Sequence, residues 1–140
     1  MPSLKIKFEN CFLIIVIVQF LHSTVEVIFS PYDWMPFVSG KIHYFLSFIP
    51  VITFPKEQFI VANMILIVFL IMLSVLVFRK VAWAIILAKI TVYAEIFNAL
   101  LHLSAAVIFL RYAPGCVTGI GFLVMGYLYF RNNYLTQNKI

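Results

Sequence analysis

The chain has 140 residues, of which 64% are hydrophobic and only 11% are charged, and its formal net charge is +5. Soluble domains carry about 25% charged residues, so this composition excludes a water-soluble surface and indicates an integral membrane protein in a lipid bilayer. Residues 1–140 have room for one membrane domain and for no separate soluble domain. The basic residues do not alternate with exposed aromatic residues, which excludes a nucleic-acid partner.

Four apolar stretches approach the length of a transmembrane helix, which is about 20 residues. They cover residues 11–29, 58–78, 81–110 and 116–130. The first follows two lysines, as in a signal peptide, but polar residues interrupt it and no small-residue cleavage pattern follows, so we expect a mature helix. The sequence therefore predicts an all-α, four-transmembrane-helix bundle.

The segment between the first two spans is apolar but is broken at Pro36, Gly40, Pro50 and Pro55. Proline interrupts the hydrogen-bond ladder of a helix, and irregular backbone within a membrane has to be covered by protein. We therefore expect only a short interfacial or re-entrant helix here, over Ile42–Ile49.

Basic residues near the span ends predict the orientation, because cytoplasmic loops carry an excess of lysine and arginine. Six of them fall on one side of the membrane: Lys5, Lys7, Arg79, Lys80, Arg131 and Lys139. Three fall on the other side: Lys41, Lys56 and Arg111. This asymmetry places both termini in the cytoplasm.

Two spans carry polar side chains that the hydrocarbon disfavours, since an ionisable group there costs about 2.5–3.5 kcal/mol. Each of these spans carries one amide, one imidazole and one carboxylate, although in a different order along the two spans. In both spans the three residues are spaced i, i+3 and i+7, so they share one helix face. They are Gln19, His22 and Glu26 in the first span and Glu95, Asn98 and His102 in the third.

The depth of these residues supports their grouping. Counted from the span midpoints at about 1.5 Å per residue, both histidines and Glu26 lie in the outer half of the membrane, and Glu95 lies near its middle. Asn63 in the second span and Thr118 in the fourth also fall in the outer half. We therefore expect all four helices to contribute polar groups to one outer pocket.

Two histidines and two carboxylates on facing helices predict a metal site, with His22, Glu26, Glu95 and His102 as ligands or acid–base groups. Zinc takes such ligands and keeps one position open in catalytic sites, and the same groups on bundle helices suit iron or manganese. Haem held by both histidines is less favoured, because it leaves the adjacent carboxylates unexplained. A hydrogen-bond network that only joins the helices and a proton relay stay open.

Three motifs together resemble the HXXEE family of bacterial membrane proteins, which has an HXXEE motif, a second histidine and a YXPG motif. The corresponding segments run from His22 to Glu26, from Asn98 to His102 and from Tyr112 to Gly115. The resemblance implies a multi-helix protein of the bacterial inner membrane, of uncharacterised function and suspected of being an enzyme. Its motif positions map onto His22, Glu26, His102, Tyr112, Pro114 and Gly115.

The chain departs from the family pattern at Val25, where the family has its first glutamate. Either Glu95 supplies the missing carboxylate from the third span, or the chemistry that needs both carboxylates has been lost.

The YXPG segment lies between the third and fourth spans and predicts a turn. Proline stops a helix there and glycine permits a sharp reversal, and Tyr112 is placed to cover the pocket from outside. Gly119 and Gly126 follow and offer small surfaces for close helix packing.

Three functions stay open at this point. The first is a metal-dependent membrane enzyme that acts on a lipid-like substrate, and the paired polar faces favour it. The second is a non-enzymatic protein that binds a small apolar ligand or serves as an accessory subunit. The third is a small proton-coupled carrier. The sequence leaves the substrate, the metal and the oligomeric state undecided.

Overall fold

The computed structural model describes residues 6–29, 31–53, 55–110 and 112–137, and this part of the chain is helical without any strand. Its helices, in chain order, are α1 (Phe8–Phe29), α2 (Pro31–Phe45), α3 (Lys56–Phe78), α4 (Ala82–Ile108) and α5 (Cys116–Gln137). The predicted all-α fold is therefore confirmed.

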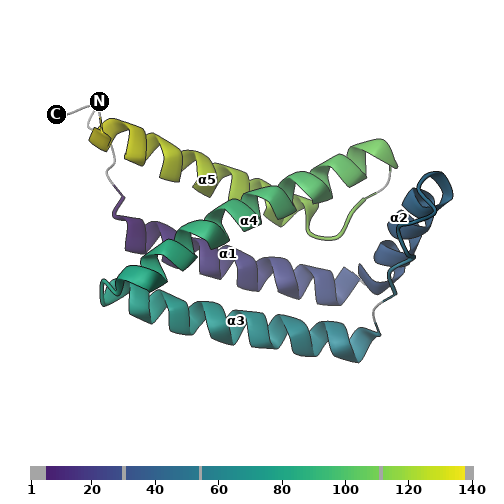
Figure 1. Cartoon of the computed structure of the whole chain (residues 1–140), viewed down its shortest axis with the longest axis horizontal. Helices are drawn as coiled ribbons and strands as arrows, with labels where there is room; N and C mark the ends of the chain where they lie inside the picture. The colour runs from purple at the N-terminus through teal and green to yellow at the C-terminus, as the bar shows by residue number, and fades with distance from the viewer. Residues whose placement is uncertain (1–5, 30, 54, 111, 138–140) are drawn as a thin grey trace.

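Four of the helices form a bundle, and α2 lies across one end of it (Figure 1). Each long helix packs on two neighbours in the order α1, α3, α4, α5 and back to α1, so α1 and α4 face each other across the diagonal. Helix α4 runs obliquely to α1 and α3 (Figure 1), as its unusual length of 27 residues requires in a short bundle. Side chains from α1 and α4 can thus meet in the centre.

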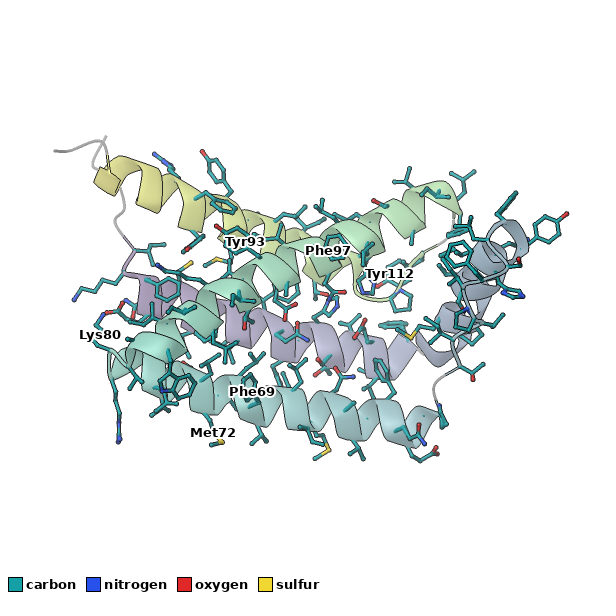
Figure 2. The ribbon with its side chains drawn as sticks, in the orientation of Figure 1. Phe69, Met72, Lys80, Tyr93, Phe97 and Tyr112 are labelled. Carbon is teal, nitrogen blue, oxygen red and sulfur yellow. The ribbon has the colours of Figure 1, made fainter. Side chains whose placement is uncertain are left out.

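Three helices, α1, α3 and α4, are long and apolar enough to cross a membrane. The apolar part of α5 is shorter and covers Cys116–Arg131, so the fourth crossing stays a prediction. Large apolar side chains such as Phe69 and Met72 point outward from α3 (Figure 2), and this outward surface suits lipid rather than water. The molecule is an α-helical membrane protein.

The turn between α3 and α4 lies at the same end of the bundle as the start of α1 and the end of α5 (Figure 1). Lys80 closes the turn with a left-handed backbone, φ 59°. Its ammonium group pairs with the Glu9 carboxylate on the first turn of α1. This ion pair joins the start of α1 to the turn between α3 and α4.

Helix α2 corrects the expected position of the connecting helix. The expected range, Ile42–Ile49, overlaps α2 only at its last four residues, because α2 begins at Pro31 and runs through Pro36. Pro31 suits the first position of a helix, whereas Pro36 lies inside α2 and leaves one bond of the helical ladder unmade. The helix ends before Ile49 because a residue that precedes a proline, here Pro50, disfavours helical backbone.

Most of the apolar core lies toward the end of the bundle where α1 begins and α3 ends. The core contains Cys11, Phe12, Ile15 and Val16 from α1, Leu70, Leu73 and Val77 from α3, Ala84, Ala88, Val92 and Ala99 from α4, and Phe122, Met125 and Tyr129 from α5. In α3, every buried residue falls in the C-terminal half of the helix. Toward the other end, the polar half of the bundle, polar contacts also join α1 to α4 and α5.

Small residues bring α4 and α5 together, as the sequence predicts. A Cβ atom at Gly119 would meet Ala99 at 3.5 Å, which is ordinary contact. At Gly126 a Cβ atom would lie 2.5 Å from the side chain of Ile96, so glycine is required unless that side chain moves. This close packing positions the start of α5 beside α1 and α4.

Candidate metal centre

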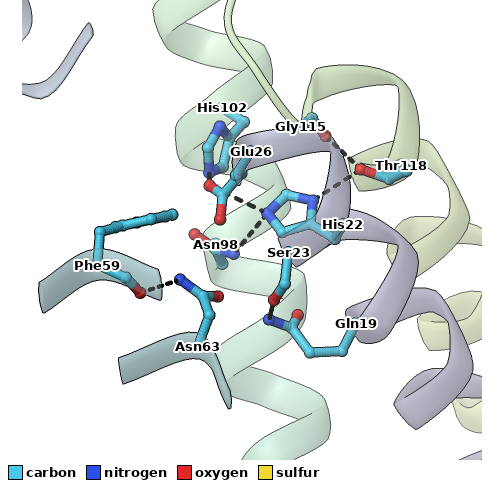
Figure 3. Close-up of polar contacts among 10 residues, drawn as sticks. All are labelled: Gln19, His22, Ser23, Glu26, Phe59, Asn63, Asn98, His102, Gly115 and Thr118. Atoms are coloured by element: carbon cyan, nitrogen blue, oxygen red, sulfur yellow. Dashed lines mark hydrogen bonds and ion pairs between the residues drawn. The ribbon is translucent and has the colours of Figure 1, made fainter. Parts of the chain in front are cut away.

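Three side chains meet in the polar half of the bundle, across the diagonal between α1 and α4 (Figure 3). His22 and Glu26 lie one turn apart on α1, and His102 comes from α4. Their potential ligand atoms all lie within 4.8 Å of one another. Among the described residues, this is the only group of three or more such side chains that could hold one metal ion. His22 is fully buried, whereas Glu26 and His102 keep 12% and 15% of their side-chain surface exposed.

The Glu26 carboxylate connects the two histidines. Its Oε1 atom lies 3.4 Å from His22 Nε2 and 3.2 Å from His102 Nε2. Ligands about 2.0–2.2 Å from a tetrahedral metal ion lie about 3.4 Å from one another, so these separations suit a shared cation. A proton on either imidazole would satisfy the same contacts, and the site can therefore hold a metal ion or a proton.

Thr118 at the start of α5 orients the His22 ring. Its hydroxyl donates to the carbonyl oxygen of Gly115 at 3.0 Å and lies 2.7 Å from His22 Nδ1. Because the hydroxyl has a single hydrogen, His22 Nδ1 has to be the donor in the second contact, an assignment made from the partners. The Nε2 atom of a neutral His22 is then a lone pair directed at Glu26, as in histidines that bind metals.

Asn98 on α4 supports the same lone pair. Its amide nitrogen lies 3.3 Å from His22 Nε2. Glu95 precedes Asn98 by three residues on the same face of α4. The amide therefore has a carboxylate within one helical turn if a cation takes the His22 lone pair.

Gly115 explains the YXPG motif in physical terms. Its φ of +86° is left-handed, and a Cβ atom there would lie 2.4 Å from Cε1 of His22. The predicted turn is present, with Pro114 buried beside it. Its glycine also lies directly against the His22 ring, where no side chain would fit. A turn signal in the sequence cannot reveal this second role.

Glu95 is buried at a separate place. In the orientation that satisfies both polar atoms of the Gln19 amide, its nitrogen donates to Glu95 at 2.9 Å and its oxygen accepts from Ser23 at 3.1 Å. Glu95 is outside the group formed by His22, Glu26 and His102. The structure thus splits the predicted four-residue site into a three-residue cluster and a neighbouring carboxylate held by an amide.

Asn63 and Tyr112 lie at the edges of this region. The Asn63 amide donates to the Phe59 carbonyl of its own helix at 3.0 Å, so α3 adds no described hydrogen bond to the cluster. Tyr112 is half exposed and its ring packs on Phe29, with 6.1 Å between the centroids. The cluster is therefore built by α1, α4 and α5.

Two contacts were not expected from the sequence. The buried ring of Phe122 packs on His22, with centroids 5.4 Å apart, and it lies one helical turn after Thr118. The Nδ1 atom of His102 is buried and lacks a hydrogen-bond partner among the described residues. A buried ring nitrogen without a partner is costly, and it marks the side of the cluster where a further polar ligand would be stabilised.

The packing of the two imidazole rings argues against haem. Their centroids lie 4.9 Å apart at an interplanar angle of 87°. A porphyrin would have to pass between the rings so that each could bind the iron from one face. Rings in edge-to-face contact leave no space for that plane.

Replacing Thr118 by Val is expected to weaken metal binding by about 10–100-fold, because removing an outer hydrogen-bond partner of a metal-bound histidine has effects of this size. The change keeps the side-chain shape and frees His22 Nδ1. Thr91→Val is the matched control, since the Thr91 hydroxyl donates only to the Leu87 carbonyl of its own helix. Titration of the purified variants with zinc measures both affinities, and equal affinities would contradict the role of Thr118.

A family model described as "Protein of unknown function with HXXEE motif" matches residues 13–130 of the chain. This range contains the cluster, Thr118 and Gly115. Neither a curated protein nor a solved structure matches the chain.

Proposed function

The chain belongs to the family of proteins with an HXXEE motif, and we propose that its cluster of His22, Glu26 and His102 binds a divalent transition metal for catalysis on a lipid-like substrate. The observation that carries this proposal is the convergence of three ligand atoms within 4.8 Å. The orientation of His22 by Thr118 supports it further, since it presents Nε2 to the centre.

Two histidines with one carboxylate are a ligand set of catalytic centres. Zinc hydrolases use this set and leave a fourth position open, and non-haem iron(II) enzymes use it with further open positions. When bound, such an ion activates a water molecule or a substrate oxygen as a Lewis acid. The chain's own residues hold the ion, orient His22 and exclude bulk water by burial.

The surroundings of the cluster favour a lipid-like substrate. Glu26 and His102 keep a small exposed surface and lie on helices that are apolar enough to span a membrane. We propose that the chain crosses the bacterial inner membrane four times with both termini in the cytoplasm, as the basic residues predict. A substrate that reaches this depth has to be soluble in the bilayer.

Elemental analysis and an absorption spectrum of the detergent-purified protein test the proposal. We expect about one zinc or iron ion per chain, because folded sites of this kind retain their metal. His22→Ala and His102→Ala should lose it. His43→Ala is the matched control, since His43 is exposed and binds the Ile49 carbonyl through Nδ1.

Metal retained equally in all three variants would contradict the site. No metal in any sample would leave a hydrogen-bond network that joins the helices, or a proton relay. An absorption band of haem that disappears in His22→Ala would also overturn the proposal.

A further inference from the structure

An open apolar groove of about 350 Å³ lies between α1 and the N-terminal half of α3. Its lining includes Phe20 and Val27 from α1 and Ile60, Met64 and Val68 from α3. The volume falls in the range of pockets that bind small ligands, about 300–1,000 Å³. The groove runs along both helices for about 12 Å, at 1.5 Å per residue from Ile60 to Val68.

The groove lies at the depth of the cluster and shares a wall with it. Ser23 lines the groove and is adjacent to His22 in the sequence, and its hydroxyl contacts the Gln19 amide at 3.1 Å. Asn63 lines the opposite wall, and its side chain lies on the side of α3 that faces Ser23 (Figure 3). The polar residues of the lining are Ser23, Thr24 and Asn63, whereas the surface of the groove itself is almost entirely apolar.

The side chains of the groove indicate what occupies it. Helices that pack in membranes meet through small residues, and this chain uses such residues, Gly119 and Gly126, for its own contact between α4 and α5. The groove is instead lined by large residues such as Met64 and Ile67. Such a surface suits a narrow hydrocarbon chain better than a helix of a second copy.

We propose that this groove binds the hydrocarbon chain of an amphiphilic lipid, with its polar end directed past Ser23 and Asn63 toward His22, Glu26 and His102. The assignment of this lipid as the substrate rests on the proposed function. The binding of the chain itself does not, because the groove uses none of the three metal ligands.

Photolabelling tests the proposal, with a long-chain fatty acid that carries a diazirine on its chain as the probe and the protein in nanodiscs. Labelled peptides are located by mass spectrometry. We expect labelling of the groove residues of α3 to exceed labelling at Met72 by about tenfold, the ratio that 1.4 kcal/mol of preference gives.

Met64→Trp and Met72→Trp form a matched pair on α3. The two methionines are similarly exposed, at 64% and 62%, but only Met64 lines the groove, and Met72 points away from the bundle (Figure 2). We expect Met64→Trp to abolish the excess labelling and Met72→Trp to preserve it. Metal content is measured in both variants and should equal that of the wild type.

Equal labelling of the groove and of the Met72 face would show only bulk lipid and would overturn the proposal. Cross-linking of two chains through a cysteine placed at Met64, together with absent groove labelling, would also overturn it in favour of a second copy. Groove labelling without any bound metal would support the lipid site while contradicting the proposed function, so the two failures are distinguishable.

Discussion

Replacing Glu26 by Gln is expected to weaken divalent-metal binding by more than about 100-fold, because even outer-shell changes cost 10–100-fold. The Glu26 carboxylate is the group within 3.4 Å of both imidazoles. The glutamine amide has the same shape but no negative charge. Its NH₂ group would also donate to Nε2 of His22 or His102, the nitrogens that have to bind the cation. Isothermal titration of the purified, metal-stripped protein with zinc measures the loss.

Glu95→Gln is the matched control for this prediction. Glu95 is the other buried carboxylate of the polar half, but it binds the Gln19 amide and lies outside the cluster. We expect this variant to keep the zinc affinity of the wild type within a few-fold. A loss in Glu95→Gln equal to that in Glu26→Gln would restore the four-ligand site expected from the sequence and contradict the three-residue cluster.

Gly115→Ala is expected to disrupt the cluster from outside the helices that carry it. A left-handed backbone costs a non-glycine residue about 1–2 kcal/mol, and the added methyl group would overlap the His22 ring, with Cε1 at 2.4 Å. His22 then has to move away from Thr118 and Glu26. We expect a fall in zinc affinity of at least about 10-fold together with a lower thermal stability.

Gly119→Ala separates this effect from a general intolerance of α5 to larger residues. A Cβ atom there would meet Ala99 at 3.5 Å, an ordinary contact, and alanine favours helix by about 1 kcal/mol over glycine. This variant should keep both zinc binding and stability. If Gly115→Ala also keeps both, the glycine of the YXPG segment serves only the turn.

The long helices and the helix face of each group of polar residues could be predicted, because both depend on patterns along the sequence. Apolar length predicts the long helices, and the spacing of i, i+3 and i+7 aligns the polar residues along α1 and α4. Distances along the helix decide which of them can share an ion. Glu95 and His102 are seven residues apart, about 10 Å at the rise of an α-helix, and the structure leaves Glu95 outside the cluster that contains His102.

Contacts between distant segments could not be predicted from these patterns. Thr118 is a common polar residue of a membrane helix, and only the packing of α5 against α1 brings it to His22. Gly115 has a sufficient explanation as a turn residue, which conceals its contact with the imidazole. The predicted range of the connecting helix was wrong because Pro36 was taken as a break, whereas α2 continues through it.

The buried polar residues of the cluster are costly in a membrane, and the stability of the bundle does not account for their presence. The apolar core, most of which lies toward the other end, joins α1, α3, α4 and α5, so the helices are held together without the polar cluster. His22, Glu26 and His102 meet where this core ends, and the unpartnered Nδ1 of His102 adds cost without adding stability. A site that costs stability is expected to serve a function.

X-ray absorption at the metal edge of the purified protein tests the central claim most directly, because it reports the ligands themselves. The expected spectrum has two imidazole nitrogens and a carboxylate oxygen at about 2.0–2.2 Å, and the metal-edge signal should disappear in His102→Ala. A shell of sulfur ligands, or a spectrum that His102→Ala leaves unchanged, would contradict a metal held by His22, Glu26 and His102.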